Sequence, residues 1–523
     1  MWYNTGIRLE NEYSKKKGRR YMKILFCSGF SLFGTGSGTL IRTQTESFLD
    51  QGDEVAIISC ENTTENVTKD DGVKYYPVFF TAQDENAEKI EGAFPFNFPM
   101  FTGSTVSTEN FWKMDIDKIK AIMEKYQATV HQAIEEFQPD VIFGQHLWLH
   151  SYLAMREAAG KIPVVTTIHG TDLKGYGEKI PEFMKTASET DKKKFEIYKK
   201  CAEDAARMGD KFIVISEAQK KRFKELYPEF ASKAVLVRNS YNANKFYRIT
   251  DKSREEIIDE VFSKIQGHND PETFDLPEDP NAVELPRDFD KLAIFVGKFV
   301  EFKGVDSLIH GWKEIEDDQI AQGKKPLCIV VGAGPLGKSL REEAAKVGTK
   351  TLYFVNRQGP EIINPLHNIS DAAMVPSIHE PDGLVVKEAL AGGDPVIGGN
   401  SGGIPETLSP QPDANFVLDE ENHVICTPLG MLIPNEVTRE IKPEATDEEL
   451  ETTKIAAGKA IARATKAIFD REVVYSRDAL IEANNVYLPS AIYNDICKVF
   501  ADAGCEAAKK KLAPKVDKTP EEK

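Results

Sequence analysis

Short apolar runs alternate with amphipathic stretches along most of this chain. In the first half, an apolar run at 23–29 leads into a glycine loop at 33–38 and a helical pattern from about 39 to 51. A strand, a glycine turn and a helix in this order form a βαβ unit once the next apolar run follows. The further strand-like runs of this half are EVAIIS, DVIFGQ, PVVTTIHG, KFIVISE and AVLVRNS. The pattern predicts an α/β domain with a parallel sheet.

A second series of the same kind begins at residue 291. Its strand-like runs are LAIFVGKF, PLCIVVGAG, TLYFVN, DAAMVPS and PVIGG. Residues 250–290 lack this rhythm and are rich in Pro and Asp, which predicts a linker with an inserted element. Residues 1–21 precede the first strand as an extension, and the charged stretch 506–523 is expected to be disordered. The two predicted α/β domains span 22–249 and 291–470.

The segment 375–406, VPSIHEPDGLVVKEALAGGDPVIGGNSGGIPE, combines glycine turns with two glutamates. Glycine lets a backbone come close to a ligand, and a helix that begins after such a loop, here at Leu384, attracts phosphate. Glu380 and Glu388 flank this helix start and can accept hydrogen bonds from several hydroxyls of one ligand. Phosphate-binding amides beside hydroxyl acceptors indicate a nucleotide-sugar site.

The same segment resembles the donor-site signature of retaining family 4 glycosyltransferases, which have the GT-B fold. The signature is a Glu, seven residues and a second Glu, here with PS before it, a glycine three residues after the first Glu, EAL around the second, and PVI and GGIPE beyond. The resemblance implies an α/β protein of two Rossmann-like domains that face each other across a cleft. It also implies that helices in 471–505 pack back across the hinge, and that Gly383, Leu384, Val385 and Glu388 bind the donor.

The stretch GKFVEFKGVD at 297–306 resembles the family's phosphate-binding element. The resemblance implies that Lys298 and Lys303 reach the donor diphosphate and act as catalytic groups together with Glu380. Two cations five residues apart, around a loop after a strand, can reach adjacent phosphates. Position 298 is Lys where the family more often has Arg, so the charge is kept but a bidentate contact is lost. The alternative is two solvated lysines on a surface loop.

His169 ends the apolar run VVTTIHG, and the carboxyl ends of parallel strands are where α/β sheets present ligands. It resembles the family's histidine that lines the donor-sugar pocket, and the resemblance implies a catalytic role. The alternative is a structural histidine. Thr171 and Asp172, close behind it, are expected on the acceptor side.

Two further stretches resemble elements of the family. Thr35–Thr39 aligns with the glycine loop that covers the diphosphate, so Gly36 is expected to bind the donor and Gly38 to lie on the acceptor side. A tight turn would need the same glycines. Arg238 and Asn239 stand where the family has a Pro-Asn-Gly element near the interdomain connection, and they are also expected on the acceptor side.

Gly332 and Gly334 follow a strand in a GxGxxG pattern, which raises a rival interpretation. A dinucleotide-dependent oxidoreductase would have an acidic residue at the end of the next strand to hold the ribose. That strand ends in Asn356-Arg357 instead. The family has a similar turn beside the nucleotide, so both glycines are expected to border the donor.

Two patterns bear on metal binding. His146 and His150 are four residues apart, as a metal pair on a helix would be, but the sequence around them supplies no further ligands. The DxD spacings at 115–117 and 288–290 fall in a helical run and in the linker, where they are expected to be solvated. We therefore expect no metal site.

The resemblance implies a retaining, metal-independent hexosyltransferase. The donor would be a nucleoside diphosphate sugar, with UDP favoured over GDP, and the acceptor a hydroxyl of a sugar, a lipid-linked molecule or a small molecule. Glycan, cell-envelope and small-molecule glycoside synthesis are the expected contexts, and no cofactor is expected. Two alternatives keep the fold: a sugar-nucleotide epimerase or hydrolase, and a non-catalytic binding scaffold.

Composition narrows the partners and the location. The net charge of −17 argues against a nucleic-acid-binding protein. The cysteines form no CxxC pair, and several lie in apolar runs, which is typical of reduced, buried thiols in a cytoplasmic protein. No apolar run reaches the length of a membrane span, so at most peripheral membrane contact is expected, through basic runs such as 192–194 and 220–222. The Phe-rich stretch 94–103 is expected to pack on its own domain, with an acceptor-side lid as the alternative.

Overall fold

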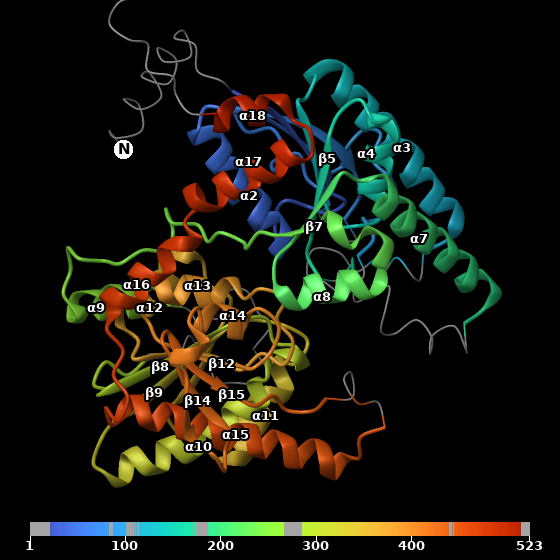
Figure 1. Cartoon of the computed structure of the whole chain (residues 1–523). Helices are drawn as coiled ribbons and strands as arrows, with labels where there is room; N and C mark the ends of the chain where they lie inside the picture. Colours follow the sequence, from blue (N-terminus) through green and yellow to red (C-terminus); the bar gives the residue numbers. More distant parts are fainter. Residues whose placement is uncertain are drawn as a thin grey trace, which may run out of the picture. The chain divides into compact units, whose positions relative to one another are not determined.

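The computed structural model describes residues 21–82, 87–100, 109, 111, 114–170, 172–173, 187–265, 285–438, 442 and 444–513. These residues form two compact units (Figure 1). The first unit comprises the chain up to Ser240 and again from Pro489 onward. The second unit comprises Tyr241 to Leu488.

The first unit is built on a parallel sheet with the strand order β3-β2-β1-β4-β5-β6-β7. Its strands are β1 (Lys23–Cys27), β2 (Glu54–Glu61), β3 (Val73–Phe79), β4 (Val141–Gln145), β5 (Val164–Ile168), β6 (Lys211–Val214) and β7 (Ala234–Leu236). Its helices are α2 (Gly36–Asp50), α3 (Ile116–Phe137), α4 (Leu149–Ala158), α7 (Glu189–Met208), α8 (Glu217–Leu226), the 3₁₀ helix η2 (Pro228–Lys233), α17 (Pro489–Asp502) and α18 (Glu506–Leu512). Every strand expected for this half is present, and β3 adds an edge strand that we did not expect.

Both faces of this sheet are covered. Along β1, Leu25 and Cys27 belong to one apolar core, while Ile24 and Phe26 belong to another. Successive side chains of a strand point to opposite faces, so each core lies on its own side of the sheet. Burial on both faces explains why the strands are continuous apolar runs.

Helix α2 begins earlier than the sequence pattern predicts. The Thr35 hydroxyl accepts a hydrogen bond from the Gly38 amide at 3.0 Å and caps the helix, so the first turn starts at Gly36. A threonine at this position satisfies an amide that the helix itself leaves unpaired. Part of the expected glycine loop is therefore helical.

Helices α17 and α18 belong to the first unit although they come last in the described chain. Phe500 of α17 stacks on Phe48 of α2 with ring centroids 6.0 Å apart, and it meets the Phe143 ring edge-on at 5.1 Å. The Tyr493 hydroxyl donates to the Asp53 carboxylate at 2.8 Å. Figure 1 shows the red α17 beside the blue α2. These helices complete the apolar cover of one sheet face.

The second unit contains a mixed sheet with the order β10-β9-β8-β11-β12-β15-β14-β13. Its strands are β8 (Lys291–Val296), β9 (Pro326–Val331), β10 (Leu352–Val355), β11 (Ala372–Val375), β12 (Val396–Gly399), β13 (Phe416–Asp419), β14 (Val424–Thr427) and β15 (Gly430–Ile433). Strands β8 to β12 confirm the expected series and are parallel, whereas β14 pairs antiparallel with both β13 and β15. The sequence pattern did not reveal β13, β14 or β15.

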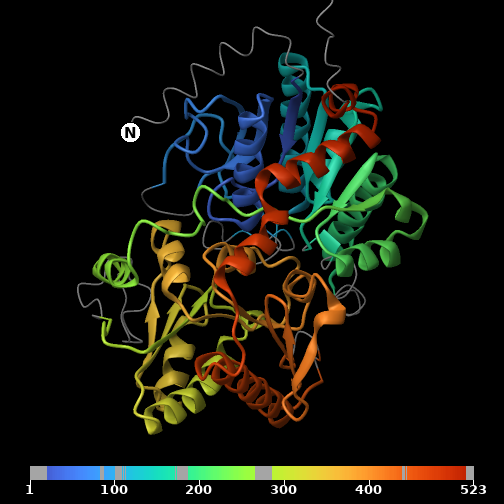
Figure 2. The same ribbon diagram turned by 60° about the vertical axis from the view of Figure 1, so that its left-hand side comes forward.

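Helices cover this second sheet on both faces as well. They are α9 (Arg254–Lys264), the 3₁₀ helix η3 (Glu301–Lys303), α10 (Val305–Ala321), α11 (Gly337–Val347), α12 (Pro360–Ile369), α13 (Leu384–Ala391), α14 (Ile404–Leu408), the 3₁₀ helix η4 (Pro412–Ala414), α15 (Asp447–Phe469), α16 (Arg477–Asn484) and the 3₁₀ helix η5 (Asn485–Tyr487). Helices α10 and α15 lie against each other (Figure 2). Their contact is close because Gly311 and Gly458 face each other, and a side chain on Gly311 would strike the Gly458 carbonyl. None of the described helices combines the length and apolar composition needed to cross a membrane.

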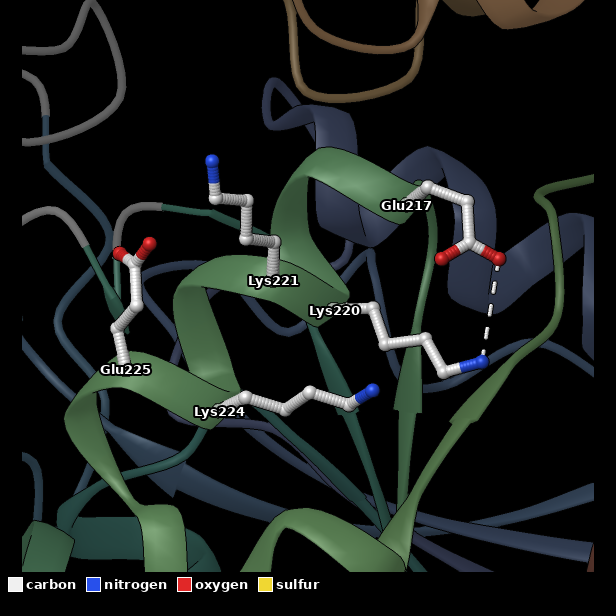
Figure 3. Close-up of a pocket in the computed structure, with 5 residues that line it drawn as sticks. All are labelled: Glu217, Lys220, Lys221, Lys224 and Glu225. Carbon is white, nitrogen blue, oxygen red and sulfur yellow. Dashed lines mark ion pairs between the residues drawn. The ribbon is translucent and has the colours of Figure 1, made fainter.

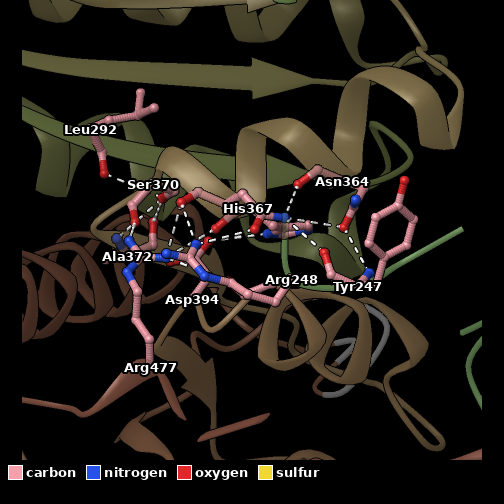
Figure 4. Close-up of polar contacts among 11 residues, drawn as sticks. Tyr247, Arg248, Leu292, Asn364, His367, Ser370, Ala372, Asp394 and Arg477 are labelled. Atoms are coloured by element: carbon pink, nitrogen blue, oxygen red, sulfur yellow. Dashed lines mark hydrogen bonds and ion pairs between the residues drawn. The ribbon is translucent and has the colours of Figure 1, made fainter. Parts of the chain in front are cut away.

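The carboxyl end of α12 is an anchoring point for two chain segments (Figure 4). The Arg477 guanidinium of α16 donates to the Asn368 carbonyl at 3.2 Å, and the Arg248 guanidinium donates to the same carbonyl at 3.1 Å. The Asn364 amide oxygen accepts a bond from the Tyr247 amide at 3.0 Å. Cations are favoured at the negative end of a helix, so both segments are held where α12 ends.

The Phe-rich stretch packs on its own unit in its described part, 94–100. The Phe80 ring, just after β3, lies 5.1 Å from Phe94, 6.1 Å from Phe96 and 6.1 Å from Phe98. Phe96 and Phe98 are buried. These contacts favour the packing interpretation over a lid, and residues 101–103 lie outside the described part of the chain.

Candidate active site

Two loops of the second unit meet at the carboxyl edge of its parallel strands. The loop between β8 and α10 ends at Gly304, whose φ of +65° is left-handed and whose missing side chain lets it pass the Pro376 carbonyl closely. The Ile378 amide, just after β11, donates to the Phe302 carbonyl at 2.9 Å. The loop with the two lysines therefore lies directly against the segment that leads to Glu380.

Lys303 and Glu380 form an ion pair across these loops. The Lys303 ammonium donates to the Glu380 carboxylate, and the side chains are 18% and 14% exposed. Two residues singled out from separate motifs, 77 positions apart, are thus in contact. An ammonium has three donors, so Lys303 can keep Glu380 and still bind a phosphate oxygen.

Helix α13 starts beside this pair. Gly383 has a φ of +82°, which turns the chain into the helix, and Leu384 and Val385 form its first residues. The first amides of a helix have no partner within it and carry partial positive charge. The helix start is therefore suited to an anionic group.

Glu388 lies on the same helix, one turn beyond its start. The residue is half-buried, and this burial raises the pKa of its carboxyl to about 7. Burial disfavours the charged form of a carboxyl group. A pKa this close to neutrality marks Glu388 as a candidate functional group.

A buried ion pair, which the sequence interpretation missed, lies between the two glutamates in the chain. The Lys387 ammonium donates to both oxygens of the Asp382 carboxylate at 2.7 Å, and the side chains are 0% and 3% exposed. Removing one partner of such a pair costs about 3–5 kcal/mol. The pair spans five positions across a turn into a helix, and neither helical nor strand periodicity brings such positions together, so no spacing rule signals it.

The turn after β12 supports the Glu380 loop from the other side. The Gly403 amide donates to the Glu380 carbonyl at 3.0 Å. Gly402 has a φ of +56°, and a side chain there would overlap this same carbonyl. Both glycines of SGGIPE are therefore explained by close packing of one loop on another.

Gly332 and Gly334, which were also predicted to border the donor, pack on the loop that follows β8. Side chains on Gly332 and Gly334 would overlap the backbone of Gly297 and Phe299, so packing between two loops already requires both glycines. Lys298 lies two residues after β8, and desolvation lowers the pKa of its ammonium.

In the first unit, His169 follows β5 and contacts the last residue of β4 and the residue after it. Its Nε2 lies 2.8 Å from the Gln145 amide oxygen, and its ring centroid lies 4.4 Å from that of His146. Burial, helped by the neighbouring His146, lowers the pKa of His169 to about 3. The ring is therefore neutral at pH 7, and Gln145 is a partner that the sequence interpretation did not identify.

The Asp172 carboxylate is turned toward the backbone. It accepts hydrogen bonds from the amides of Gly170 and Leu147 at 2.8 and 2.9 Å, and the residue is 1% exposed. The contacts fix the turn that carries His169. Thr171 lies outside the described residues.

The glycines of the first helix differ in their surroundings. A side chain on Gly38 would overlap the Ser31 and Leu32 carbonyls, so packing requires this glycine, whereas the space around Gly36 is open for 4 Å. Glu61 at the end of β2 holds the same loop, since its carboxylate accepts from the Ser31 hydroxyl at 2.7 Å and the Leu32 amide at 3.0 Å. The sequence offered no motif for Glu61.

Arg238 and Asn239 follow β7, at the same carboxyl edge of the first sheet. Asn239 is buried and Arg238 is half-buried. The strands of this sheet are parallel, so the segments after β1, β4, β5 and β7 share one edge. The candidate residues of the first unit therefore gather at one edge of its sheet.

His146 and His150 do not lie on one helix, as a metal-binding pair four residues apart would. His146 has a left-handed φ of +69° and precedes α4, whereas His150 lies within it. Burial lowers the pKa of both rings to about 3. Both rings pack among aromatic side chains, with His146 4.8 Å from Phe30 and His150 4.5 Å from Tyr126.

Among the described residues, one group of three has ligand atoms close enough for a metal ion: His310, Glu343 and Glu451. The His310 Nε2 lies 2.9 Å from the Glu343 carboxylate. Lys454 lies 3.7 Å from the same carboxylate and 2.6 Å from Glu451. A cation of the chain itself thus already neutralises these carboxylates.

Helix α8 has an open pocket on its surface, lined by Glu217, Lys220, Lys221, Lys224 and Glu225 (Figure 3). Lys220 pairs with Glu217 at 3.8 Å, and Arg222 pairs with Glu225 at 3.2 Å. Two residues of the basic run, Lys220 and Arg222, therefore have acidic partners on their own helix. This arrangement favours the solvated-face interpretation over membrane contact.

Two family models match the chain. One, described as Glycosyltransferase Family 4, matches residues 34–245, and the other, described as Glycosyl transferases group 1, matches residues 279–423. A D-inositol 3-phosphate glycosyltransferase of Corynebacterium efficiens is 29% identical over 155 residues, or 28% of this chain and 36% of that protein. An uncharacterized glycosyltransferase of Methanocaldococcus jannaschii is 27% identical over 123 residues, or 23% and 30% of the two chains. The chain thus spans about a third of the length of these curated relatives.

Solved structures extend the likeness to the whole fold. A glycosyltransferase from Rickettsia africae has a TM-score of 0.51 at 15% identity, covering 93% of this chain and 99% of its own. Anabaena HepE in complex with UDP and glucose has a TM-score of 0.50 at 16% identity, covering 92% and 100%. The chain has two Rossmann-like units; one family model matches mostly the first unit, and the other lies within the second. The chain therefore belongs to the glycosyltransferases of family 4 and group 1, with the GT-B fold.

Proposed function

We propose that this protein is a retaining glycosyltransferase that moves a hexosyl unit from a nucleoside diphosphate sugar to a hydroxyl acceptor. The observation that carries this proposal is the convergence of Lys303 and Glu380 beside the start of α13, with Glu388 on the same helix. A cation, a helix start and two carboxylates match the parts of an activated sugar: phosphates on one side and hydroxyls on the other.

Each group has a proposed role. Glu388 accepts bonds from the ribose hydroxyls and Glu380 from those of the hexose. The diphosphate accepts hydrogen bonds from the amides of Gly383, Leu384 and Val385. Lys298 and Lys303 add positive charge there. Stabilising the charge that develops on the leaving diphosphate is the main catalytic task, and these groups supply it without a metal ion.

The acceptor would lie at the carboxyl edge of the first sheet. His169, at this edge, is neutral and can exchange hydrogen bonds with the hydroxyls of the donor sugar, and the open space around Gly36 leaves room for the donor diphosphate. Arg238, Asn239 and the turn after His169 would contribute the remaining acceptor contacts. The configuration at the anomeric carbon would be retained because the acceptor attacks from the front face. In this attack, the departing phosphate accepts the acceptor's proton.

UDP is the favoured nucleotide, and GDP is the second choice. HepE, which has a similar fold, was crystallised with UDP and glucose. The curated relatives named for D-inositol 3-phosphate make a phosphorylated polyol one acceptor to test. Calorimetry with UDP-, GDP-, ADP- and dTDP-sugars would identify the donor class.

The proposal predicts the effect of two substitutions. Glu388→Ala and Lys303→Ala should each lower transfer at least about a hundredfold, because each removes a group that binds the donor or its leaving charge. Transfer is measured with the donor found by calorimetry, and folding by thermal melting. Lys324→Ala is the matched control, since Lys324 forms an ion pair with Asp470 at 2.7 Å away from these loops. Full activity in both variants would contradict the proposal.

The alternatives give different results in the same assays. An epimerase would convert a UDP-sugar to its epimer without any acceptor, and a hydrolase would release the free sugar. A scaffold without catalysis would show no turnover. Transfer to an added hydroxyl acceptor with retention at the anomeric carbon would support the transferase.

A further inference from the structure

The buried pair of Asp382 and Lys387 needs an explanation beyond stability. Taking two charges out of water is costly, and apolar side chains of similar size often stabilise a protein as well or better. The pair is nevertheless almost fully buried, with both carboxylate oxygens bonded to one ammonium. Its place in the fold suggests what it does.

The pair closes the turn between the two candidate glutamates. Asp382 stands two residues after Glu380, and Lys387 immediately precedes Glu388. Between them, Gly383 turns the chain with a φ of +82° into α13. Two hydrogen bonds across this turn therefore fix both the direction of the first helix amides and the position of the backbone at Glu380.

Lys387 is also held from its other side. Its ammonium lies 4.5 Å from the centre of the Tyr487 ring, a cation–π contact. Its carbonyl accepts a bond from the Asn484 side chain at 2.9 Å. Asn484 ends α16 and Tyr487 lies in η5. A second element of the same unit thus fixes the lysine, and the lysine in turn fixes Asp382.

Three anchors therefore converge on the loop at 380–385. Asp382 is held by Lys387, the Glu380 side chain is held by Lys303, and the Glu380 carbonyl is held by the Gly403 amide. Only the first anchor is buried and charged at both ends.

We propose that Asp382 and Lys387 are positioning residues for the donor site: they hold the 380–385 loop in the shape that binds a nucleoside diphosphate sugar. Because both are buried, they do not touch the ligand. They act through Glu380, Leu384 and Val385. This inference rests on the proposed function for the identity of the ligand, but not for the order of the loop.

Amide hydrogen exchange of the ligand-free full chain tests the order of the loop. In Lys387→Met, an unpaired Asp382 carboxylate must be protonated or move toward water, so amides in 379–388 should exchange at least about tenfold faster than in the unsubstituted chain. The matched control is Asp394→Asn, which changes another buried pair of this unit, with His367 at 3.0 Å. This control should leave exchange in 379–388 unchanged.

Calorimetry with UDP tests the consequence for the donor. Affinity should fall about tenfold in Lys387→Met, since small displacements of positioned groups are costly, and by less than about twofold in Asp394→Asn. A merely structural role would weaken both variants alike.

A second variant, Asp382→Leu/Lys387→Met, removes both charges and avoids an unpaired buried group, so it should fold even where the single variant does not. Faster exchange confined to 379–388 in this variant supports the proposal. Exchange and UDP affinity equal to those of the unsubstituted chain would overturn it. If the unsubstituted chain binds no nucleotide sugar, the proposed function fails, and the exchange measurement still decides whether the pair orders the loop.

Discussion

Glu388 should control the pH dependence of donor binding. Its pKa is raised from 4.5 to about 7 by burial, and the ionised form is the better acceptor for two ribose hydroxyls. About one carboxyl in ten is ionised one pH unit below the pKa. We therefore expect UDP to bind about tenfold more weakly at pH 6 than at pH 8 in calorimetry.

Glu388→Gln should remove this dependence. Glu436 offers a matched control, because burial also raises the pKa of its carboxyl to about 7 while its partner is the Ser307 hydroxyl. Glu436→Gln should keep the pH profile of binding. The raised pKa of Glu388 also affects stability. Between about pH 4.5 and 7, folded Glu388 retains a proton that the unfolded chain releases, so rising pH lowers the free energy of unfolding in this window. A flat affinity between pH 6 and 8 would refute the assignment.

At the scale of residues, the sequence could identify groups that belong to motifs but not their partners. Lys303 and Glu380 were found from two separate motifs, and the structure brings them into contact. Lys387 and Glu61 have no motif, because their partners are set by the tertiary fold. A buried charge can be recognised only when its surroundings are known.

Gly402 provides a test at the scale of an element. Its φ is +56°, and an added methyl would overlap the Glu380 carbonyl. Gly402→Ala should therefore push the Glu380 loop out of place, lower the unfolding free energy by more than the cost of about 1 kcal/mol for a left-handed alanine, and weaken UDP binding. Urea unfolding and calorimetry measure the two effects.

Gly323 is the control for backbone strain alone. Its φ of +75° is similar, but nothing lies within 4 Å of an added methyl. Gly323→Ala should show only the cost of the left-handed conformation and no change in affinity. Equal effects of the two substitutions would show that the contact with the Glu380 loop is unimportant.

Two of the strands that the sequence missed lack the pattern of a strand buried on both faces. Strand β3 contains Pro77 and polar positions, which are features of an edge strand, and it indeed lies at the sheet edge. In β13, the side chains of Phe416 and Val417 are exposed, so its apolar residues do not mark a buried strand. Strands β14 and β15 are four residues long, but so are the predicted β10, β11 and β12, so their length does not explain why they were missed. The parallel strands that were predicted are buried on both faces, and their apolar runs are continuous.

At the scale of the molecule, the first unit depends on residues far away in the sequence. Phe500 is fully buried between the Phe48 and Phe143 rings. Phe500→Ala should lower the unfolding free energy of the first unit by about 3–5 kcal/mol, seen as an earlier thermal transition of that unit. Phe416→Ala, at a ring that is 55% exposed in the second unit, should change stability by no more than about 0.5 kcal/mol. An unchanged transition for Phe500→Ala would contradict this dependence.

The late position of α17 and α18 has a consequence for biosynthesis. Residues 241–488 are contiguous and can fold as soon as they leave the ribosome. In the first unit, however, one apolar face of the sheet is only partly covered, by α2, until residues 489–512 have been translated. The first unit is thus synthesised first but completes its fold last. Until then, its uncovered apolar surface is exposed to chaperones and to aggregation. Nascent chains stalled before residue 489 should be digested by protease in the first unit while the second resists.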